Sequence, residues 1–569
     1  MKEANVSVAS KMLHGAFILT LATVLSKLIG TLQKIPLQNM GGDVVFGIYN
    51  TVYPFYSLVI TLAIAGFPIA ISKFVAESDV AGNYKESRRI LRLSSLFIGL
   101  LGIVLGICTY VGAPLIARWI DNAHVVSAIR YVSIAFLFVP MMSLLRGFFQ
   151  GHQNMVPTAI SQIVEQSVRV AVMILLLLYL TSREAGPESI AAGALFGSAA
   201  GGAAGLLVML LYWRRYRTSA KRARVLEETT ARCEVATASA SEATTRVLGA
   251  SIPVRSESSW RLLRKIVLYA IPICLASLAL PIMNLVDTFT VPKLLKAGGI
   301  GDSGAMIQFG IYNRGIPLVQ LITMLATSLS VLFIPALAEA RFKGDTLLIQ
   351  NQCRLSLRWF WMMGLAASVG LCVLAEPINV MLYQDAMGTD TVRWIAFTAA
   401  FSSISLISAA LLQGIGIVKA PAVNLLVGAL AKTLLNLWLV PKFGITGAAI
   451  AFVAAHILAA ALNVALLVRS TGLRIRAGAL LAKPALILAG LASAAAGAQW
   501  AAATVSSALG LRAGRMAAVV ESLSGVTAGA IVFVILVVLT KLITEEELRM
   551  LPKVGSGLAK LLQKLRVLR

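Results

Sequence analysis

Residues 46–50 of this chain read FGIYN, and residues 309–313 read FGIYN again. The two copies lie 263 residues apart, which is 309 minus 46. Four further pairs of residues keep the same separation: Pro54 with Pro317, Gln150 with Gln413, Gly151 with Gly414, and Arg169 with Lys432. Chance matches would have different separations, so a separation shared over so much of the chain indicates an internal duplication.

The composition indicates the environment in which this duplicated chain folds. Of the 569 residues, 58% are hydrophobic and only 13% are charged, whereas a soluble domain carries about 25% charged residues. Apolar stretches of about 20 residues, long enough to cross a bilayer, recur along the chain. They lack the alternation of apolar and polar residues that marks the strands of a membrane barrel. The sequence therefore predicts an all-α integral membrane protein.

About fourteen membrane-spanning helices are expected, and the duplicated unit contains six of them. Their approximate positions are 12–36, 46–76, 90–113, 125–148, 154–180, 188–213, 261–294, 307–338, 351–374, 391–414, 418–440, 444–468, 480–504 and 515–542. Because six is an even number, the two copies are parallel repeats with the same orientation in the membrane. The expected divisions are an N-terminal six-helix lobe at 1–213, a basic cytoplasmic linker at 214–259, a C-terminal six-helix lobe at 260–470, helices 13 and 14 at 471–545, and a basic cytoplasmic tail at 546–569.

The positive charge indicates how the chain is oriented in the membrane. Lys and Arg number 50 against 25 Asp and Glu, a formal net charge of +25. Twelve of the bases lie within residues 214–265, on the same side as both termini if the number of spans is even. Cytoplasmic loops of membrane proteins collect Lys and Arg, so both termini are expected to face the cytoplasm. This rule accounts for the excess of bases, and no nucleic-acid partner is expected.

Charged residues inside the predicted spans are candidates for a binding site, because each costs about 2.5–3.5 kcal/mol to insert at a helix centre. Bases outnumber acids there, so a cavity between the lobes is expected to be positive and to hold an anion, best a phosphate group. Asn50 and Asn313 end the two FGIYN copies and are expected to face this cavity. The predicted substrate-binding residues are Lys27, Lys34, Asn50, Arg169, Asn313, Arg314 and Lys432.

Three of the charged residues have a second interpretation. Asp287 is a candidate for ion coupling or, alternatively, the counter-ion of a cavity lysine. Glu165 is the other candidate for ion coupling, but it stands four residues before Arg169, and the two side chains can instead pair along one helix face. Lys34 lies near the predicted outer surface and can extend toward it rather than into the cavity.

Two stretches resemble a known family. Residues 26–78, SKLIGTLQKIPLQNMGGDVVFGIYNTVYPFYSLVITLAIAGFPIAISKFVAES, and residues 146–170, RGFFQGHQNMVPTAISQIVEQSVRV, are similar to the stage V sporulation protein B group. That group belongs with the lipid II flippase-like polysaccharide transporters of the multidrug/oligosaccharidyl-lipid/polysaccharide flippase superfamily. The resemblance implies two lobes, alternating access, a groove for a lipid tail on helices 13 and 14, and a location in the bacterial cytoplasmic membrane.

The resemblance also implies basic residues on helices one, two and eight. Lys27 and Lys34 match the first of these helices and Arg314 matches the eighth, whereas the early second helix has Asn50 and Thr51 and no Arg. The expected function is a flippase that moves an undecaprenyl-diphosphate-linked cell-wall precursor, lipid II or a related lipid-linked polysaccharide unit, from the inner to the outer leaflet. The alternatives are a cation-coupled multidrug exporter of the same superfold and a non-transporting membrane scaffold for cell-wall synthesis.

The chain shows no pattern of an enzyme or a metalloprotein. It contains no G-x-x-x-x-G-K-[ST] motif for a nucleotide, and neither its four His nor its five Cys have the spacing of metal ligands. No cofactor and no catalytic residue are therefore expected. The expected partners are a lipid-linked diphosphate, membrane lipids and proteins of cell-wall synthesis, and the expected state is a monomer.

Overall fold

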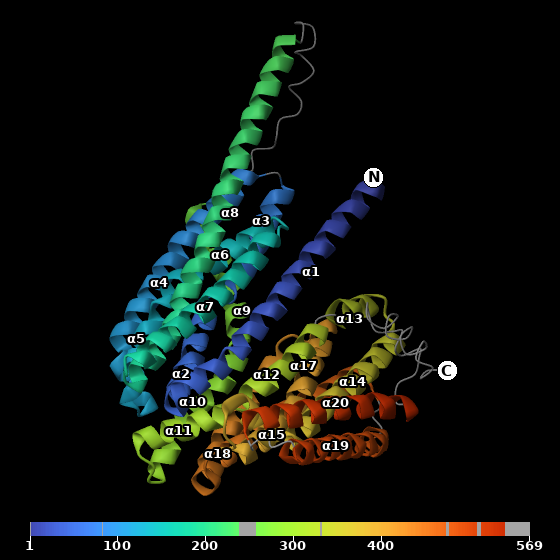
Figure 1. Ribbon diagram of the computed structural model, residues 1–569. Coiled ribbons are helices and arrows are strands. Elements are labelled where there is room, and N and C mark those ends of the chain that lie inside the picture. The colour runs from blue at the N-terminus through green and yellow to red at the C-terminus, as the bar shows by residue number, and fades with distance from the viewer. Residues whose placement is uncertain are drawn as a thin grey trace.

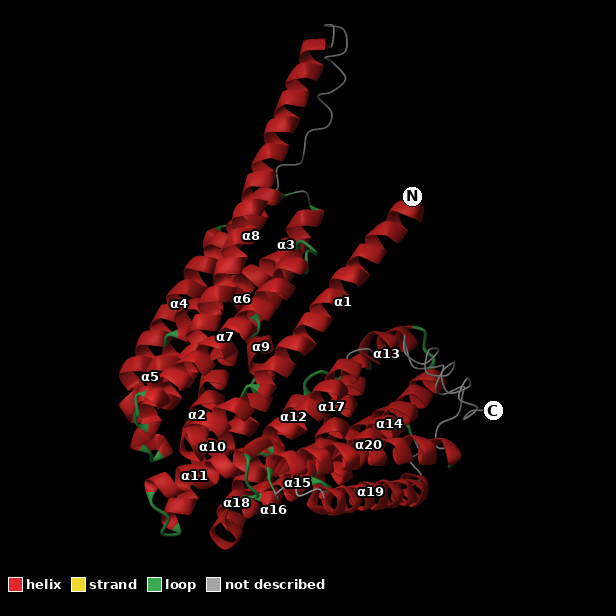
Figure 2. Ribbon diagram, viewed as in Figure 1, coloured by secondary structure: helices red, strands yellow, loops and turns green. Residues whose placement is uncertain are grey.

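The computed structural model describes residues 2–540, apart from residue 82 and the segments 238–257, 331–332, 474–476 and 509–513. Within these residues every regular element is a helix, and Figure 2 shows no strand among them. The predicted tail at 546–569 and the later part of the predicted linker lie outside the described residues. The earlier part of that linker continues α8 as a helix as far as Thr237.

The described residues of the first half of the chain form eight α-helices and one short 3₁₀ helix. They are α1 (Lys2–Leu32), α2 (Lys34–Ile64), α3 (Phe67–Val80), α4 (Tyr84–Ile120), η1 (Ala123–Val125), α5 (Val126–Ser133), α6 (Ala135–Gly151), α7 (Val156–Ser182) and α8 (Pro187–Thr237).

The second half begins at α9 and carries two additional helices at its end. It comprises α9 (Ser259–Ser277), α10 (Ala279–Ala297), α11 (Asp302–Asn313), α12 (Ile316–Ser330), α13 (Phe333–Phe342), α14 (Thr346–Val373), α15 (Ala375–Tyr383), α16 (Thr389–Ala396), α17 (Thr398–Gly414), α18 (Ala420–Thr471), α19 (Ala477–Ala508) and α20 (Arg515–Leu539).

These helices are long and apolar enough for a multi-pass membrane protein. Among the described residues, ten helical stretches can cross a membrane by length and composition, or up to twelve when each of two bent pairs counts as one span. Two of the ten, Phe17–Val80 with 64 residues and Ala420–Thr471 with 52, are long enough for two crossings each, because about 20 residues cross a bilayer. The exact number of fourteen stays a prediction.

The two longest stretches are broken at glycines with positive φ. Gly42 in α2 has φ 77°, and Gly444 in α18 has φ 57°, a region that residues with a Cβ rarely adopt. At Gly444 the chain turns back on itself: the side chains of Asn424 and Asn463, one on each arm of α18, are joined by a hydrogen bond of 2.8 Å. The arms of α18 therefore form a hairpin inside one helical stretch.

The helices form two lobes that diverge from one end of the molecule. In Figure 1, α2–α8 lie together on one side, α11–α20 lie on the other, and α1 runs between them. The lobes meet where the α10–α11 and α15–α16 connections lie, which we call the distal end, and separate toward the end where α1 begins and α8 projects, which we call the linker end. The bent pair α9–α10, with an angle of 50°, bridges the lobes, because α9 packs on α3 whereas α10 packs on α18.

The repeated FGIYN stretch forms the contact between the lobes at the distal end. A Cβ on Gly47 of α2 would lie 2.1 Å from the backbone oxygen of Met306, and a Cβ on Gly310 of α11 would lie 2.2 Å from the backbone oxygen of Asp43. The 263-residue shift relates Gly47 to Gly310 and Asp43 to Met306, so each lobe makes the same contact with the other. We call this pair of contacts the glycine crossing. Only glycine permits so close an approach, which gives a physical reason for glycine at this position in both copies.

Candidate functional site

A cavity of about 570 Å³ lies between the two lobes. Its N-terminal wall is built by side chains of α1, α2, α6 and α7, and its C-terminal wall by side chains of α10, α11, α12, α17 and α18. Of the predicted substrate-binding residues, Lys27, Lys34, Asn50, Arg169 and Asn313 line it. Arg314 and Lys432 do not line it, and their surroundings are described below.

The N-terminal wall contains a buried cluster of two arginines and one glutamate. Glu165 Oε2 accepts a hydrogen bond from Arg146 at 3.0 Å, and Glu165 Oε1 accepts one from Arg169 at 2.6 Å. All three side chains are at most 14% exposed. The pairing of Glu165 with Arg169 that the sequence left open is thus present, and the cluster keeps one positive charge in excess. A glutamate held by two arginines is positioned to orient them.

Two further bases on this wall have no carboxylate partner within the described part of the chain. Lys34 is 8% exposed and Lys27 is exposed to the cavity. Beside them, the Ser26 hydroxyl and the Gln33 carboxamide oxygen are buried without a hydrogen-bond partner. Buried polar groups are normally paired, and a buried charge without a partner costs several kcal/mol. The two lysines and the Ser26 hydroxyl can donate to an anion, whereas the Gln33 carboxamide oxygen can only accept a hydrogen bond.

Asn50 and Asn313 occupy equivalent places on the two walls. Each side-chain amide donates a hydrogen bond of 2.8 Å to the backbone oxygen four residues earlier, Phe46 in one copy and Phe309 in the other. Both residues are buried and line the cavity. The duplicated stretch thus supplies one glycine to the crossing and one asparagine to the cavity from each lobe.

The acid and the base of the C-terminal lobe pair with each other. Lys432 Nζ lies 2.7 Å from Asp287 Oδ2 and 3.2 Å from the backbone oxygen of Met283. The same carboxylate accepts hydrogen bonds from Tyr312 at 2.7 Å and from Asn436 at 3.1 Å. Lys432 is fully buried, so only Asp287 reaches the cavity surface. Asp287 is thus paired with a lysine that does not itself line the cavity, and these contacts tie α10, α11 and α18 together.

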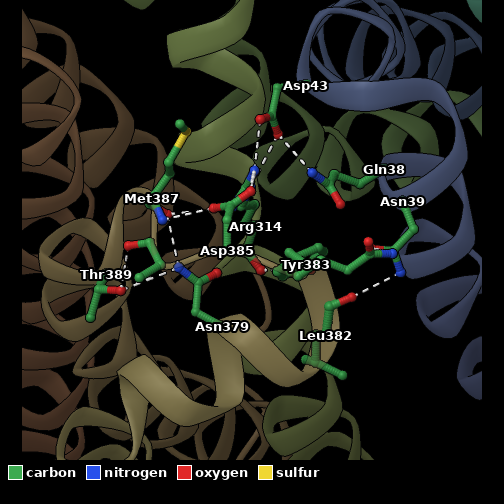
Figure 3. Close-up of polar contacts among 12 residues, drawn as sticks. Gln38, Asn39, Asp43, Arg314, Asn379, Leu382, Tyr383, Asp385, Met387 and Thr389 are labelled. Carbon is green, nitrogen blue, oxygen red and sulfur yellow. Dashed lines mark hydrogen bonds and ion pairs between the residues drawn. The ribbon is translucent and has the colours of Figure 1, made fainter. Parts of the chain in front are cut away.

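Arg314 lies at the distal end, next to the glycine crossing, and is completely buried. Its guanidinium donates to Asp43 of the other lobe at 2.6 and 3.1 Å and to Asp385 at 2.5 and 3.0 Å (Figure 3). The Tyr383 hydroxyl donates to the backbone oxygen of Arg314 at 2.9 Å. We call Asp43, Arg314 and Asp385 the distal lock. Bidentate pairs of this kind are among the strongest polar contacts in proteins.

Smaller contacts close the distal end around the lock. The Asn39 amide donates to the backbone oxygen of Leu382 at 2.9 Å, as Figure 3 shows, and Gln384 donates to Asn39 at 3.3 Å. Lys296 lies 3.0 Å from Asp121 of the other lobe.

Sequence reasoning missed Asp43 and Asp385, because their partner is far away in sequence. One signal was present: Arg314 is equivalent to Thr51 under the 263-residue shift, so the copies differ in charge at this position.

The described residues contain no group of three or more His, Cys, Asp or Glu side chains that could hold a metal ion. The site consists instead of unpaired bases, amides and hydroxyl groups around a cavity between duplicated lobes. The sequence pattern of a family described as "Polysaccharide biosynthesis protein" matches residues 12–341. The chain belongs to this family.

Three proteins of Bacillus subtilis are similar to this chain over most of their length. The chain is 33% identical to the uncharacterized membrane protein YabM of Bacillus subtilis (strain 168), over 97% of this chain and 96% of that protein. It is 31% identical to the lipid II flippase MurJ of the same organism, over 78% and 80% of the two chains. It is 26% identical to stage V sporulation protein B, over 95% and 98%.

Solved structures show the fold of this family member. A lipid II flippase MurJ in an inward closed conformation aligns with a TM-score of 0.60 at 13% identity, over 92% of this chain and 99% of that one. An inward-facing multidrug resistance MATE family transporter of the MOP superfamily aligns with a TM-score of 0.58 at 14% identity, over 79% and 94%. The fold is therefore that of a two-lobe membrane transporter, as the sequence predicted.

Proposed function

We propose that this protein is a flippase that moves an undecaprenyl-diphosphate-linked cell-wall precursor, lipid II or a related lipid-linked polysaccharide unit, to the outer leaflet. The observation that carries the proposal is the charge of the cavity wall. The N-terminal wall contributes four bases and one acid, a surplus of three positive charges (four minus one). That surplus offsets the roughly two negative charges of a diphosphate in a site where an unpaired base is costly. The similarity to a lipid II flippase over most of both chains supports the same assignment.

The described conformation is one step of an alternating-access cycle in this proposal. The distal lock and the glycine crossing hold the lobes together at one end, while the bases of the N-terminal wall line the cavity and can bind the diphosphate. Binding of the diphosphate neutralises those bases, which lowers the cost of burying them as the lobes close around it. Release of the distal lock then opens the other end. The lipid tail stays in the bilayer beside the protein throughout.

The orientation and the surroundings form part of the proposal. The linker end is cytoplasmic, because the sequence segment 214–265 holds twelve bases and α8, which carries the first of them, projects at that end. The membrane is the bacterial cytoplasmic membrane, both termini face inward, and the protein acts as a monomer beside proteins of cell-wall synthesis. The two lobes correspond to 1–213 and 260–470, with the intervening segment as a linker and 471–545 as a separate helix pair.

A multidrug exporter has the same fold, so the cavity chemistry must separate the two functions. A site for organic cations needs unpaired buried acids, because a cation must find a counter-charge there. In the described part of the cavity wall both acids are paired, Glu165 with two arginines and Asp287 with Lys432. The cavity therefore favours an anion.

The test is movement of a fluorescent undecaprenyl-diphosphate-linked saccharide in liposomes that contain the purified protein. Wild type is expected to expose the lipid to a membrane-impermeant reagent added on the opposite side. Lys34→Ala is expected to lower the rate at least about tenfold, the loss of one charge-assisted contact. The matched control is Lys343→Ala, which removes an exposed lysine outside the cavity.

The stability of the same variant separates loss of binding from loss of folding. Lys34 is buried without a carboxylate partner, so its removal relieves a cost in the empty protein. We expect Lys34→Ala to unfold at the same temperature as wild type or higher while transport falls. If wild type moves no lipid-linked diphosphate, or if Lys34→Ala moves it as fast as wild type, the proposed function is wrong.

A further inference from the structure

The two walls of the cavity differ in chemistry. The N-terminal wall carries the unpaired bases, whereas the C-terminal wall presents amides and hydroxyl groups. Its polar side chains include Asn284 of α10, Asn313 of α11, Gln320 and Thr323 of α12, and Thr398 and Ser402 of α17. Among the described residues lining this wall, Asp287 is the one that carries a formal charge. Its charge is balanced by Lys432 at 2.7 Å.

Several of these groups have hydrogen-bonding capacity that the protein does not use. The Thr398 hydroxyl is fully buried and has no partner in the described structure. Asn284 and Gln320 are exposed to the cavity, and their amides make no hydrogen bond with any described residue. A buried hydroxyl without a partner costs about 1–3 kcal/mol, and most such groups in proteins are satisfied. An unused donor and acceptor set around a cavity therefore points to a neutral polar ligand group.

We propose, on the basis of the proposed function, that the C-terminal wall is a subsite for an uncharged sugar attached to the diphosphate. The diphosphate lies against Lys27, Lys34 and Arg169, and the sugar reaches across the cavity to Asn284, Gln320 and Thr398. Amides and hydroxyls donate to and accept from sugar hydroxyl and acetamido groups equally well. The position of the sugar is fixed because the anion is bound by the opposite wall.

The same wall selects against an acidic sugar. A carboxylate placed there finds no unpaired cation, and the Asp287 carboxylate already stands on that surface. Removal of a carboxylate from water is costly without a paired base, and the nearby cation, Lys432, is already paired with Asp287. The subsite therefore discriminates between a hydroxymethyl group and a carboxylate on an otherwise identical sugar.

The test is binding of three lipids to the purified full-length protein in nanodiscs: undecaprenyl diphosphate, undecaprenyl diphosphoglucose and undecaprenyl diphosphoglucuronate. Glucose is expected to tighten binding about tenfold over the bare diphosphate, the effect of one or two added hydrogen bonds. Glucuronate is expected to bind at least about tenfold more weakly than glucose. Gln320→Ala combined with Asn284→Ala is expected to remove the gain from glucose and leave the bare diphosphate unchanged.

A charge substitution separates direct recognition from a structural effect. Gln320→Arg supplies the missing cation and is expected to reverse the preference, so that glucuronate binds more tightly than glucose. Equal binding of glucose and glucuronate by wild type, or an unreversed preference in Gln320→Arg, overturns the subsite. Failure of all three lipids to bind overturns the proposed function itself, since the bare diphosphate needs only the N-terminal wall.

Discussion

Gly310→Ala is expected to open the distal end of the protein. The added Cβ would lie 2.2 Å from the backbone oxygen of Asp43, 3.0 Å from its carbonyl carbon and 3.2 Å from its Cα. All three are backbone atoms of the other lobe, so no side chain can rotate away. The contact can be relieved only if α11 moves away from the start of α2.

The size of that movement sets the expected effect. Ordinary contact begins near 3.4 Å, so the two helices must separate by about 1.2 Å (3.4 minus 2.2). A shift of that size would stretch the 2.6 Å bond between Arg314 and Asp43 beyond hydrogen-bonding distance. Overpacking costs about 1–3 kcal/mol. The ratio of distally closed to distally open molecules should therefore fall about 5- to 150-fold.

Spin labels across the distal end measure this ratio directly. Glu184 of the N-terminal lobe and Ala386 of the C-terminal lobe are exposed, are located in connections and take no part in the distal lock. In wild type the distance distribution between the labels is expected to show mainly the closed state. In Gly310→Ala a second, longer distance should appear and become the larger population.

The matched control is Gly112→Ala, in α4. A Cβ at Gly112 would have no atom within 4 Å, so the same substitution there should leave the distance distribution unchanged. A wild-type distribution in Gly310→Ala would refute the claim that the glycine crossing holds the distal end closed. A drop in unfolding temperature without a longer distance would assign the glycine to folding alone.

Four further predictions use the same labels or the same protein. Gly47→Ala should lengthen the distal distance as Gly310→Ala does, since its Cβ would lie 2.1 Å from a backbone oxygen of the other lobe. Arg314→Gln should also open the distal end, because two acids then face each other without a cation, and a normal distance would count against the distal lock. Partial burial alone would raise the pKa of the Asp385 carboxyl, but the hydrogen bonds from Arg314 and from the Met387 backbone, together with the Arg314 charge, hold that pKa below its usual value. The stabilisation of the closed state by ionised Asp385 is therefore present above the unfolded pKa of that carboxyl and is lost only as the pH falls through the lower folded value. The closed distance should persist between about pH 8 and pH 5 and should be lost only in stronger acid. Lys432→Met should lower the unfolding free energy by about 3–5 kcal/mol by leaving Asp287 unpaired, and the double variant with Asp287→Leu should recover much of that loss in a thermal unfolding assay.

The sequence predicted the helical membrane fold and the duplication, because both depend on patterns that repeat along the chain. The 263-residue shift brings α2 and α11 into equivalent positions, and the structure packs them against each other. The apolar stretches predicted most of the membrane-spanning helices. The hairpin inside α18 and the bend between α9 and α10 were not predicted in this way, because they depend on where the chain turns in space.

The charged residues show where sequence reasoning stops. The positions of the charged residues in the predicted spans indicated that bases outnumber acids there, and Lys27 and Lys34 do line the cavity. The partners of Arg314 could not be read in the same way, because Asp43 is 271 residues away and belongs to the other lobe. Helix periodicity relates residues three or four positions apart, and it carries no information on which charges meet across an interface between lobes.

The duplication explains why the distal end closes in two ways that differ in symmetry. The glycine crossing is made by both copies, so a change on either side affects the backbone of both lobes. The distal lock exists on one side only: the residues equivalent to Arg314, Asp43 and Asp385 under the 263-residue shift are Thr51, Met306 and Asn122. There a contact of 3.8 Å joins the Thr51 hydroxyl to the Met306 sulfur in place of an ion pair. Because Arg314 is completely buried and both carboxylates pair with it, the three charges act as one unit. Substitutions within that unit can change the balance between closed and open states while the crossing keeps the helices in register, whereas a side chain at either glycine cannot be accommodated without moving both lobes.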